Sequence, residues 1–135
     1  SLHDALPISI AHRLPPYRND PRAYFQYDII HDVPAALDAV AALQQPGEPL
    51  FVSVYASKPF RFYHGGRQMP ATMCPEPCPR VGTVLDQWMA QLSGRGWLLL
   101  LDDEVDQYVR YLGIRGFRWR VAATLRGAQV WELQR

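Results

Sequence analysis

The segment formed by residues 50–56 limits the possible folds more than any other part of the chain. It is apolar, β-branched and aromatic, which predicts a strand covered on both faces. Prolines and a glycine at 46–49 separate it from the preceding element. After residue 56, aromatic residues recur at helical spacing over 60–63, and a glycine pair at 65–66 ends that turn. A strand leading directly into a helix is typical of α/β proteins, which place ligands at the carboxyl ends of strands.

Two helices are predicted on either side of this unit. Asp32 is a suitable N-cap with Pro34 in the first turn, so a helix is expected from there to residues 44–45. Residues 67–80 contain four prolines and are expected to form a surface loop without a regular helix or central strand. A stripe of apolar residues over 81–92 predicts the second helix, which should end at a Ser-Gly pair.

The last third of the chain has the same strand and helix patterns. Residues 96–101 predict a buried strand, and Asp102 or Asp103 is expected to cap the helix that follows. Gly113 should end that helix, with Ile114 making the apolar contact beyond it. Residues 117–123 and 128–133 predict a hairpin that turns at 126–127.

This order of elements predicts an α/β fold: a small layered sandwich with a mostly parallel sheet and a C-terminal antiparallel hairpin. The length of 135 residues and the hydrophobic content of 48% suit one domain, which we place at 32–135. A net charge of +1 argues against nucleic acid as a partner. The apolar runs are far shorter than the ~20 residues of a membrane helix, and no signal peptide is evident.

The first residues look unrelated to the rest of the chain. Residues 1–8 resemble translated sequencing-adapter DNA, which recurs in metagenomic assemblies, so we interpret 1–12 as an artefact or a disordered lead. Residues 13–31 are rich in proline, arginine and tyrosine and are expected to form an extended linker.

Candidate ligand-binding residues lie at the predicted strand ends. Tyr55, Ser57 and Lys58 follow the first strand, whereas Asp102 and Asp103 follow the second. In a parallel sheet these side chains could face one crevice, and Lys58 near a helix start could bind an anion. The alternatives are a solvated loop lysine and aspartates that serve as helix caps.

Tyr63 and His64, at the end of the short helical turn, complete the candidate ligand-binding set. Cys74 and Cys78 could pair in an oxidising compartment or remain free thiols. We expect no metal site, because zinc requires about four ligands and His64 is the one plausible helper near the cysteines. No catalytic residue is assigned.

Several segments together resemble a family of membrane enzymes. Residues 37–66 follow the pattern L-x-x-V-x-x-L…P-G-E/D-P-L-F-V-x-V-Y-A…P-F-x-F-Y. Residues 94–100 fit an R-x-W strand, 104–116 fit a D-E-x-x-x-x-x-Y-L-x-x-x-G helix, and 122–133 fit a closing G-A-x-V-x-x-L strand. This part of the chain resembles the C-terminal tail of multi-span bacterial glycosyltransferases of the protein O-mannosyltransferase and lipid A aminoarabinose transferase type.

The resemblance implies a parent protein in the cell inner membrane that transfers a sugar from a polyprenyl-phosphate donor to a glycolipid or protein acceptor. This chain would be its non-catalytic tail domain on the periplasmic or extracellular side, and it would hold no cofactor itself. Its partners would be the N-terminal membrane domain of the same chain and the acceptor. An oxidising location would also suit a disulfide between Cys74 and Cys78.

A second hypothesis comes from the residues themselves. The chain could be a free-standing small α/β protein, either a ligand-binding protein or an enzyme, that uses a crevice at residues 55–58. The gene upstream separates the two hypotheses, because only the first requires membrane spans fused in frame before the domain.

Overall fold

The computed structural model describes residues 31–65, 67–74 and 77–135. Over these residues the chain forms helices and strands in an alternating order, and a single 3-10 turn precedes the last helix. The helices are α3 (Val33–Leu43), α4 (Ser57–Tyr63), α5 (Val81–Gln91) and α6 (Val105–Ile114). The strands are β1 (Leu50–Val52), β2 (Thr72–Met73), β3 (Arg95–Leu101), β4 (Arg118–Leu125) and β5 (Ala128–Gln134), and the turn is η3 (Asp102–Glu104).

The described strands form one sheet in the order β2-β1-β3-β5-β4. Strands β2, β1 and β3 are parallel, β5 is antiparallel to β3, and β4 is antiparallel to β5. It follows that β4 runs in the same direction as the three parallel strands and that β5 runs against them. The predicted α/β fold with a mostly parallel sheet and a C-terminal hairpin is confirmed.

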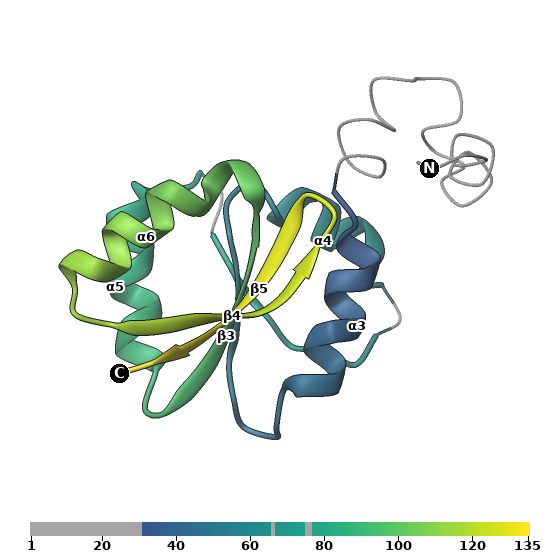
Figure 1. Ribbon diagram of the computed structural model, residues 1–135, viewed down its shortest axis with the longest axis horizontal. Helices are drawn as coiled ribbons and strands as arrows, with labels where there is room; N and C mark the ends of the chain where they lie inside the picture. Colours follow the sequence, from purple (N-terminus) through teal and green to yellow (C-terminus); the bar gives the residue numbers. More distant parts are fainter. Residues whose placement is uncertain (1–30, 66, 75–76) are drawn as a thin grey trace.

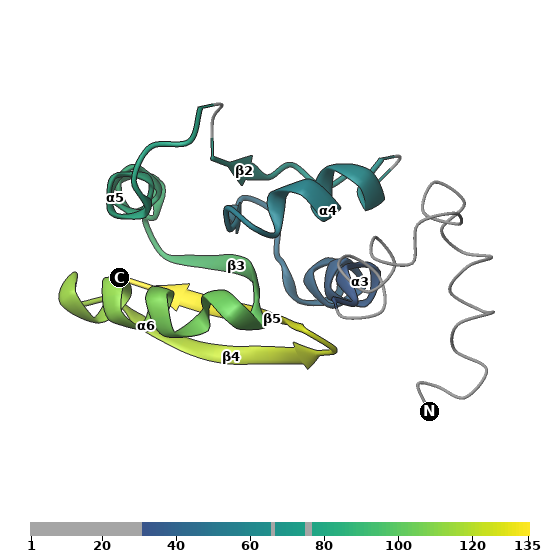
Figure 2. The same ribbon diagram turned by 90° about the horizontal axis from the view of Figure 1, so that it is seen from above.

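Helices cover both faces of the sheet, so the domain has three layers. Figure 1 shows α3 and α4 on one side and α5 and α6 on the other, and Figure 2 gives the same arrangement from above. Alternate residues of β3 supply the two cores: Trp97, Leu99 and Leu101 face α3, whereas Leu98 and Leu100 face α5 and α6. This division explains why the strand sequences are apolar at successive positions.

Two strand predictions need correction. Strand β1 ends at Val52 rather than at residue 56, because the backbone carbonyl of Ser53 already accepts the Ser57 N–H at 3.0 Å. Residues 67–80 are not entirely loop, since Thr72–Met73 forms β2 beside β1. That strand lies at the edge of the sheet, where neighbouring prolines are tolerated.

The end of α6 also differs from the prediction. Gly113 lies inside the helix, and Gly116, with a φ of 73°, adopts the left-handed conformation beyond it. Gly116 N–H donates to the Gly113 carbonyl and Phe117 N–H to the Leu112 carbonyl, both at 3.1 Å, which is the Schellman pattern. Ile114, predicted to make the apolar contact, is 74% exposed.

Two local signals are confirmed, one at the start of α3 and one at the hairpin turn. The Asp32 side chain accepts the Ala35 N–H at 3.1 Å and caps α3, and Gly127 has the positive φ of 68° that the hairpin turn requires. The predicted lead at 1–12 and all but the last residue of the predicted linker at 13–31 lie outside the described residues. No helix in the described ranges is long and apolar enough to cross a membrane.

Candidate functional site

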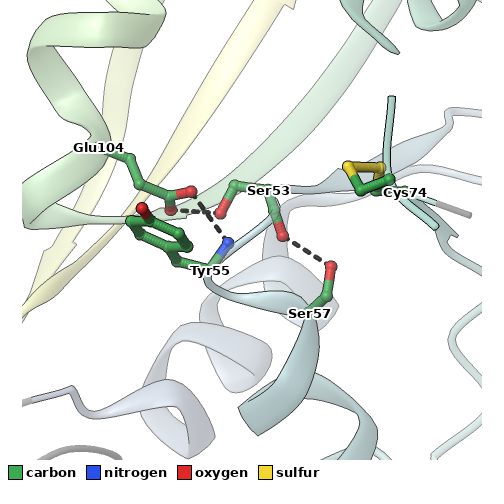
Figure 3. Close-up of a disulfide and its surroundings, with 6 residues drawn as sticks. Ser53, Tyr55, Ser57, Cys74 and Glu104 are labelled. Carbon is green, nitrogen blue, oxygen red and sulfur yellow. Dashed lines mark hydrogen bonds between the residues drawn. A yellow bond between two sulfur atoms is a disulfide. The ribbon is translucent and has the colours of Figure 1, made fainter. Parts of the chain in front are cut away.

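A buried carboxylate joins two of the parallel strands at their carboxyl ends (Figure 3). Glu104, the last residue of η3, is 2% exposed. Its carboxylate accepts hydrogen bonds from the Ser53 hydroxyl, from Tyr55 N–H at 3.0 Å and from Leu101 N–H at 3.0 Å. Since Ser53 follows β1 and Leu101 ends β3, this one side chain fixes the two strand ends relative to each other.

Two serines shape the chain between β1 and α4. The Ser53 hydroxyl also accepts the Ala56 N–H at 3.2 Å. The Ser57 hydroxyl donates to the Ser53 carbonyl at 2.7 Å, a bond that Figure 3 also shows. These local hydrogen bonds replace strand pairing, so the backbone leaves the sheet and enters the first turn of α4. Ser53 is fully buried and Ser57 is 5% exposed, so both hydroxyls are used inside the domain.

Burial raises the pKa of Glu104, and the hydrogen bonds from Ser53, Leu101 and Tyr55 oppose that effect in part. Tyr108 of α6 is buried nearby, and both its burial and the Glu104 charge raise the pKa of its phenol. Its hydroxyl makes no hydrogen bond of normal geometry with the described residues. Ser53, Glu104 and Tyr108 therefore form a polar cluster that is buried inside the domain.

The three residues predicted to bind a ligand at the end of the first strand differ in their exposure to solvent. Tyr55 is 60% exposed, whereas the Ser57 hydroxyl points inward to the Ser53 carbonyl. Lys58 lies exposed on α4. The structure thus places Tyr55 and Lys58 at the surface but removes Ser57 from it.

The two aspartates lie at the same end of the sheet, at the start of η3. Both are exposed, and neither side chain caps η3 or α6, so the capping prediction is wrong. Glu104, three residues after Leu101, instead accepts the Leu101 N–H, as the third helical residue does in a capping box. Asp102 makes a long contact of 3.5 Å with the Gln129 amide, beside the hairpin turn.

Tyr63 and His64 lie at the far end of α4 from the strand end. The Tyr63 ring meets Phe62 edge to face with ring centroids 4.8 Å apart, and Tyr63 also packs against the core on the α3 side. The His64 ring stacks on Phe60 at 4.6 Å, and its buried Nδ1 has no hydrogen-bond partner among the described atoms. Both rings therefore act in packing the end of α4.

Cys74 and Cys78 form a disulfide, with Cα atoms 5.5 Å apart. Cys74 follows β2 at the same end of the sheet as Ser53, and it is 5% exposed within the core under α5. Cys78 is exposed. The bond anchors the proline-rich segment to the edge strand. No group of three or more His, Cys, Asp and Glu side chains in the described ranges is arranged to hold a metal ion.

A groove of about 640 Å³ lies at the opposite end of the sheet, where β1 and β2 begin. Its walls combine prolines with three glutamine side chains, Gln44, Gln45 and Gln68. The Gln44 amide is already bonded to the Glu48 carbonyl at 2.7 Å. Glu48 is the one charged residue in its lining. None of the residues predicted to bind a ligand lines this groove.

Sequence reasoning missed Glu104, Ser53 and Tyr108, the residues of the buried polar cluster. One signal for Ser53 was present: it is a polar residue inside an apolar run that otherwise predicts a strand buried on both faces. Glu104 gave no such signal, because it follows two other acidic residues that are exposed.

The protein is a three-layer α/β domain, and the polar cluster at the carboxyl ends of its parallel strands is buried. Comparison with known proteins gives no relative for this chain, since no family model, no curated protein and no solved structure matches it.

Proposed function

We propose that this chain is a non-catalytic, extracytoplasmic domain of a membrane glycosyltransferase. The enzyme would transfer a sugar from a polyprenyl-phosphate donor to a glycolipid or protein acceptor, and the domain would be joined to its membrane part through the residues before α3. The proposal starts from the resemblance of residues 37–66, 94–100, 104–116 and 122–133 to the tails of such enzymes.

The disulfide between Cys74 and Cys78 is the observation that carries the proposal. Disulfides persist in oxidising compartments and are rare in the reducing cytosol. Cys78 is exposed and within reach of cellular reductants, so its pairing with Cys74 suits the periplasmic or extracellular side of a membrane.

The closed strand ends support a non-catalytic role. In α/β enzymes the carboxyl ends of parallel strands present polar side chains to a substrate. Here the Ser53 and Ser57 hydroxyls and the Glu104 carboxylate bond to one another and to the backbone instead. The groups that would perform chemistry hold the domain together.

The test is to recover the complete open reading frame by long-read sequencing of the source DNA. We expect several hydrophobic spans fused in frame upstream of Asp32, with an acidic loop early in the membrane part. A complete short gene without such spans would contradict it and would favour a free-standing α/β protein. Tyr55 and Lys58 variants tested against a ligand panel would then be the next step.

A further inference from the structure

Strand β4 is an edge of the sheet, and none of the described residues pairs with its outer side. It comes last in the strand order, and Figure 2 shows it as the outermost strand on the side away from β2. Its charged residues are Arg118 and Arg120, and Val121 beyond them is 42% exposed. An unpaired edge presents a row of backbone N–H and C=O groups that can bind a further strand. The sheet can therefore be extended at β4.

The described chain begins beside the end of this strand. Asp32, directly before α3, donates its backbone N–H to the Arg126 carbonyl at 2.6 Å. Arg126 follows the last residue of β4. The chain that leads into Asp32 therefore arrives at the carboxyl end of β4. A segment extended along β4 up to this point would run in the same direction as β4.

The sequence that leads into this point has the composition of a strand. Five of residues 24–30 are tyrosine, phenylalanine or isoleucine, and none is proline or glycine. Phe25, Tyr27 and Ile29 would share one face of such a strand. Extended backbone of this length spans about 23 Å, which is close to the length of the eight-residue β4.

The helical connections determine the side of the sheet on which such a strand must lie. Between parallel strands, α4 leads from β1 outward to β2, whereas α5 and α6 lie on the opposite face and lead in the direction of β4. These three crossovers therefore have the same hand, as parallel crossovers in proteins do. Because α3 shares the α4 face and leads into β1, a parallel strand before α3 must lie on the β4 side of β1. Strands β3, β5 and β4 fill that side, so the vacant position is beyond β4.

We propose that residues 24–30 form a further strand that pairs in parallel with β4. Its backbone would supply hydrogen-bond partners to the open edge, and its side chains would reduce the exposure of Val121. Helix α3 packs against β4 and β5, the strands that a crossover from this position to β1 must pass. The edge, the point of entry and the hand of the crossover thus select one position for this segment.

The strand would also determine where the preceding chain reaches the domain. Residue 24 would lie near Arg118, where β4 begins, at the end of the sheet opposite Glu104. For the membrane enzyme proposed above, the link from the membrane part would therefore meet the domain at the amino ends of its parallel strands. This consequence rests on the proposed function, whereas the strand itself does not.

Hydrogen exchange of backbone amides in the full chain, followed by NMR, tests for the strand. We expect the paired amides of residues 24–30 to exchange at least about tenfold more slowly than those of an unstructured chain. Tyr27→Pro introduces a residue that has no N–H for the ladder, so it should abolish this protection and speed exchange of the outer amides of β4 about tenfold. Tyr17→Pro makes the same replacement outside the proposed strand and should change neither.

Nuclear Overhauser contacts in the native protein test the direction and the edge. We expect cross-strand contacts of residue 24 with the Arg118 end of β4 and of residue 30 with Leu125. Contacts in the reverse order or with β2, unprotected exchange of residues 24–30, or equal effects of the two proline substitutions would overturn the proposal. Amide spectra of residues 31–135 show whether each variant is folded. Failure of the strand would leave the membrane proposal standing, because that proposal depends on the gene upstream.

Discussion

The hydroxyl of Ser53 donates a hydrogen bond to the carboxylate of Glu104, although the two residues lie 51 positions apart in the chain. Ser53 follows β1 and Glu104 follows β3, so this contact joins the carboxyl ends of two neighbouring parallel strands. Both residues are buried. The carboxyl ends of parallel strands, where α/β proteins commonly bind ligands, are here joined by a hydrogen bond that stabilises the domain.

Removing the Ser53 hydroxyl tests that role. Ser53→Ala leaves Glu104 buried with fewer donors and removes the acceptor of the Ala56 N–H, so we expect it to lower the free energy of unfolding by about 1–3 kcal/mol. Urea unfolding followed by circular dichroism measures the change. Ser93→Ala, at an exposed position, is the control and should change stability by less than about 0.5 kcal/mol. Equal effects of the two substitutions would contradict a structural role for Ser53.

Stability should depend on pH through Glu104. Burial raises the pKa of this carboxyl in the folded state, so the folded protein binds its proton more tightly than the unfolded chain does. The resulting stabilisation is fully present below the ordinary glutamate pKa of 4.5 and is lost as the pH rises through the folded-state pKa. Glu104→Gln cannot titrate and lacks this dependence.

The measurement is urea unfolding of the native protein and of Glu104→Gln from pH 4 to pH 8. The stability advantage of the native protein over Glu104→Gln should shrink as the pH rises. Asp106→Asn, which removes an exposed carboxyl group, is the control. An advantage that grows with pH would show that the hydrogen bonds to the ionised carboxylate outweigh its burial.

The disulfide closes a short loop and should stabilise the domain modestly. Chain entropy for a loop of this length predicts a loss of about 2 kcal/mol when Cys74 and Cys78 are both replaced by serine. A reducing agent should lower the melting temperature of the native protein and leave that of the double variant unchanged. An equal response of both proteins to the reductant would contradict the pairing.

Two glycines at the end of α6, one inside the helix and one just beyond it, should respond to alanine with opposite signs. Gly116 has a φ of 73°, so Gly116→Ala should destabilise the domain by about 1 kcal/mol. Gly113 lies in the helix with open space where a Cβ would be, so Gly113→Ala should stabilise it by about 0.5–1 kcal/mol. Thermal unfolding of the two variants gives the comparison. The reverse order would place the helix end at Gly113.

The elements predictable from the sequence are those with a local signal. Asp32 caps α3, apolar spacing marks α5, and Gly127 sets the hairpin turn. Each of these depends on residues within a few positions of one another. Two-residue strand β2 carries no such pattern, because it exists only through pairing with β1.

The buried polar cluster could not be predicted for the same reason. Glu104 and its exposed neighbours Asp102 and Asp103 are chemically alike, and only the turn of η3 directs one of the three into the core. Residue type alone favours the aspartates as helix caps, yet neither of them caps a helix, and Glu104 accepts the Leu101 N–H. The partners of Glu104 at Ser53 and Tyr55 come from a distant strand end, which no local pattern records.

The oxidation state and location of the cysteines in the full-length protein decide whether this domain lies outside the cytoplasm. The complete gene is expressed in a bacterial host, free thiols are blocked before lysis, and the membrane fraction is analysed by mass spectrometry. We expect the peptide spanning Cys74 and Cys78 to be recovered from membranes with its disulfide intact. Recovery of the protein from the soluble cytosolic fraction with both thiols alkylated would contradict it.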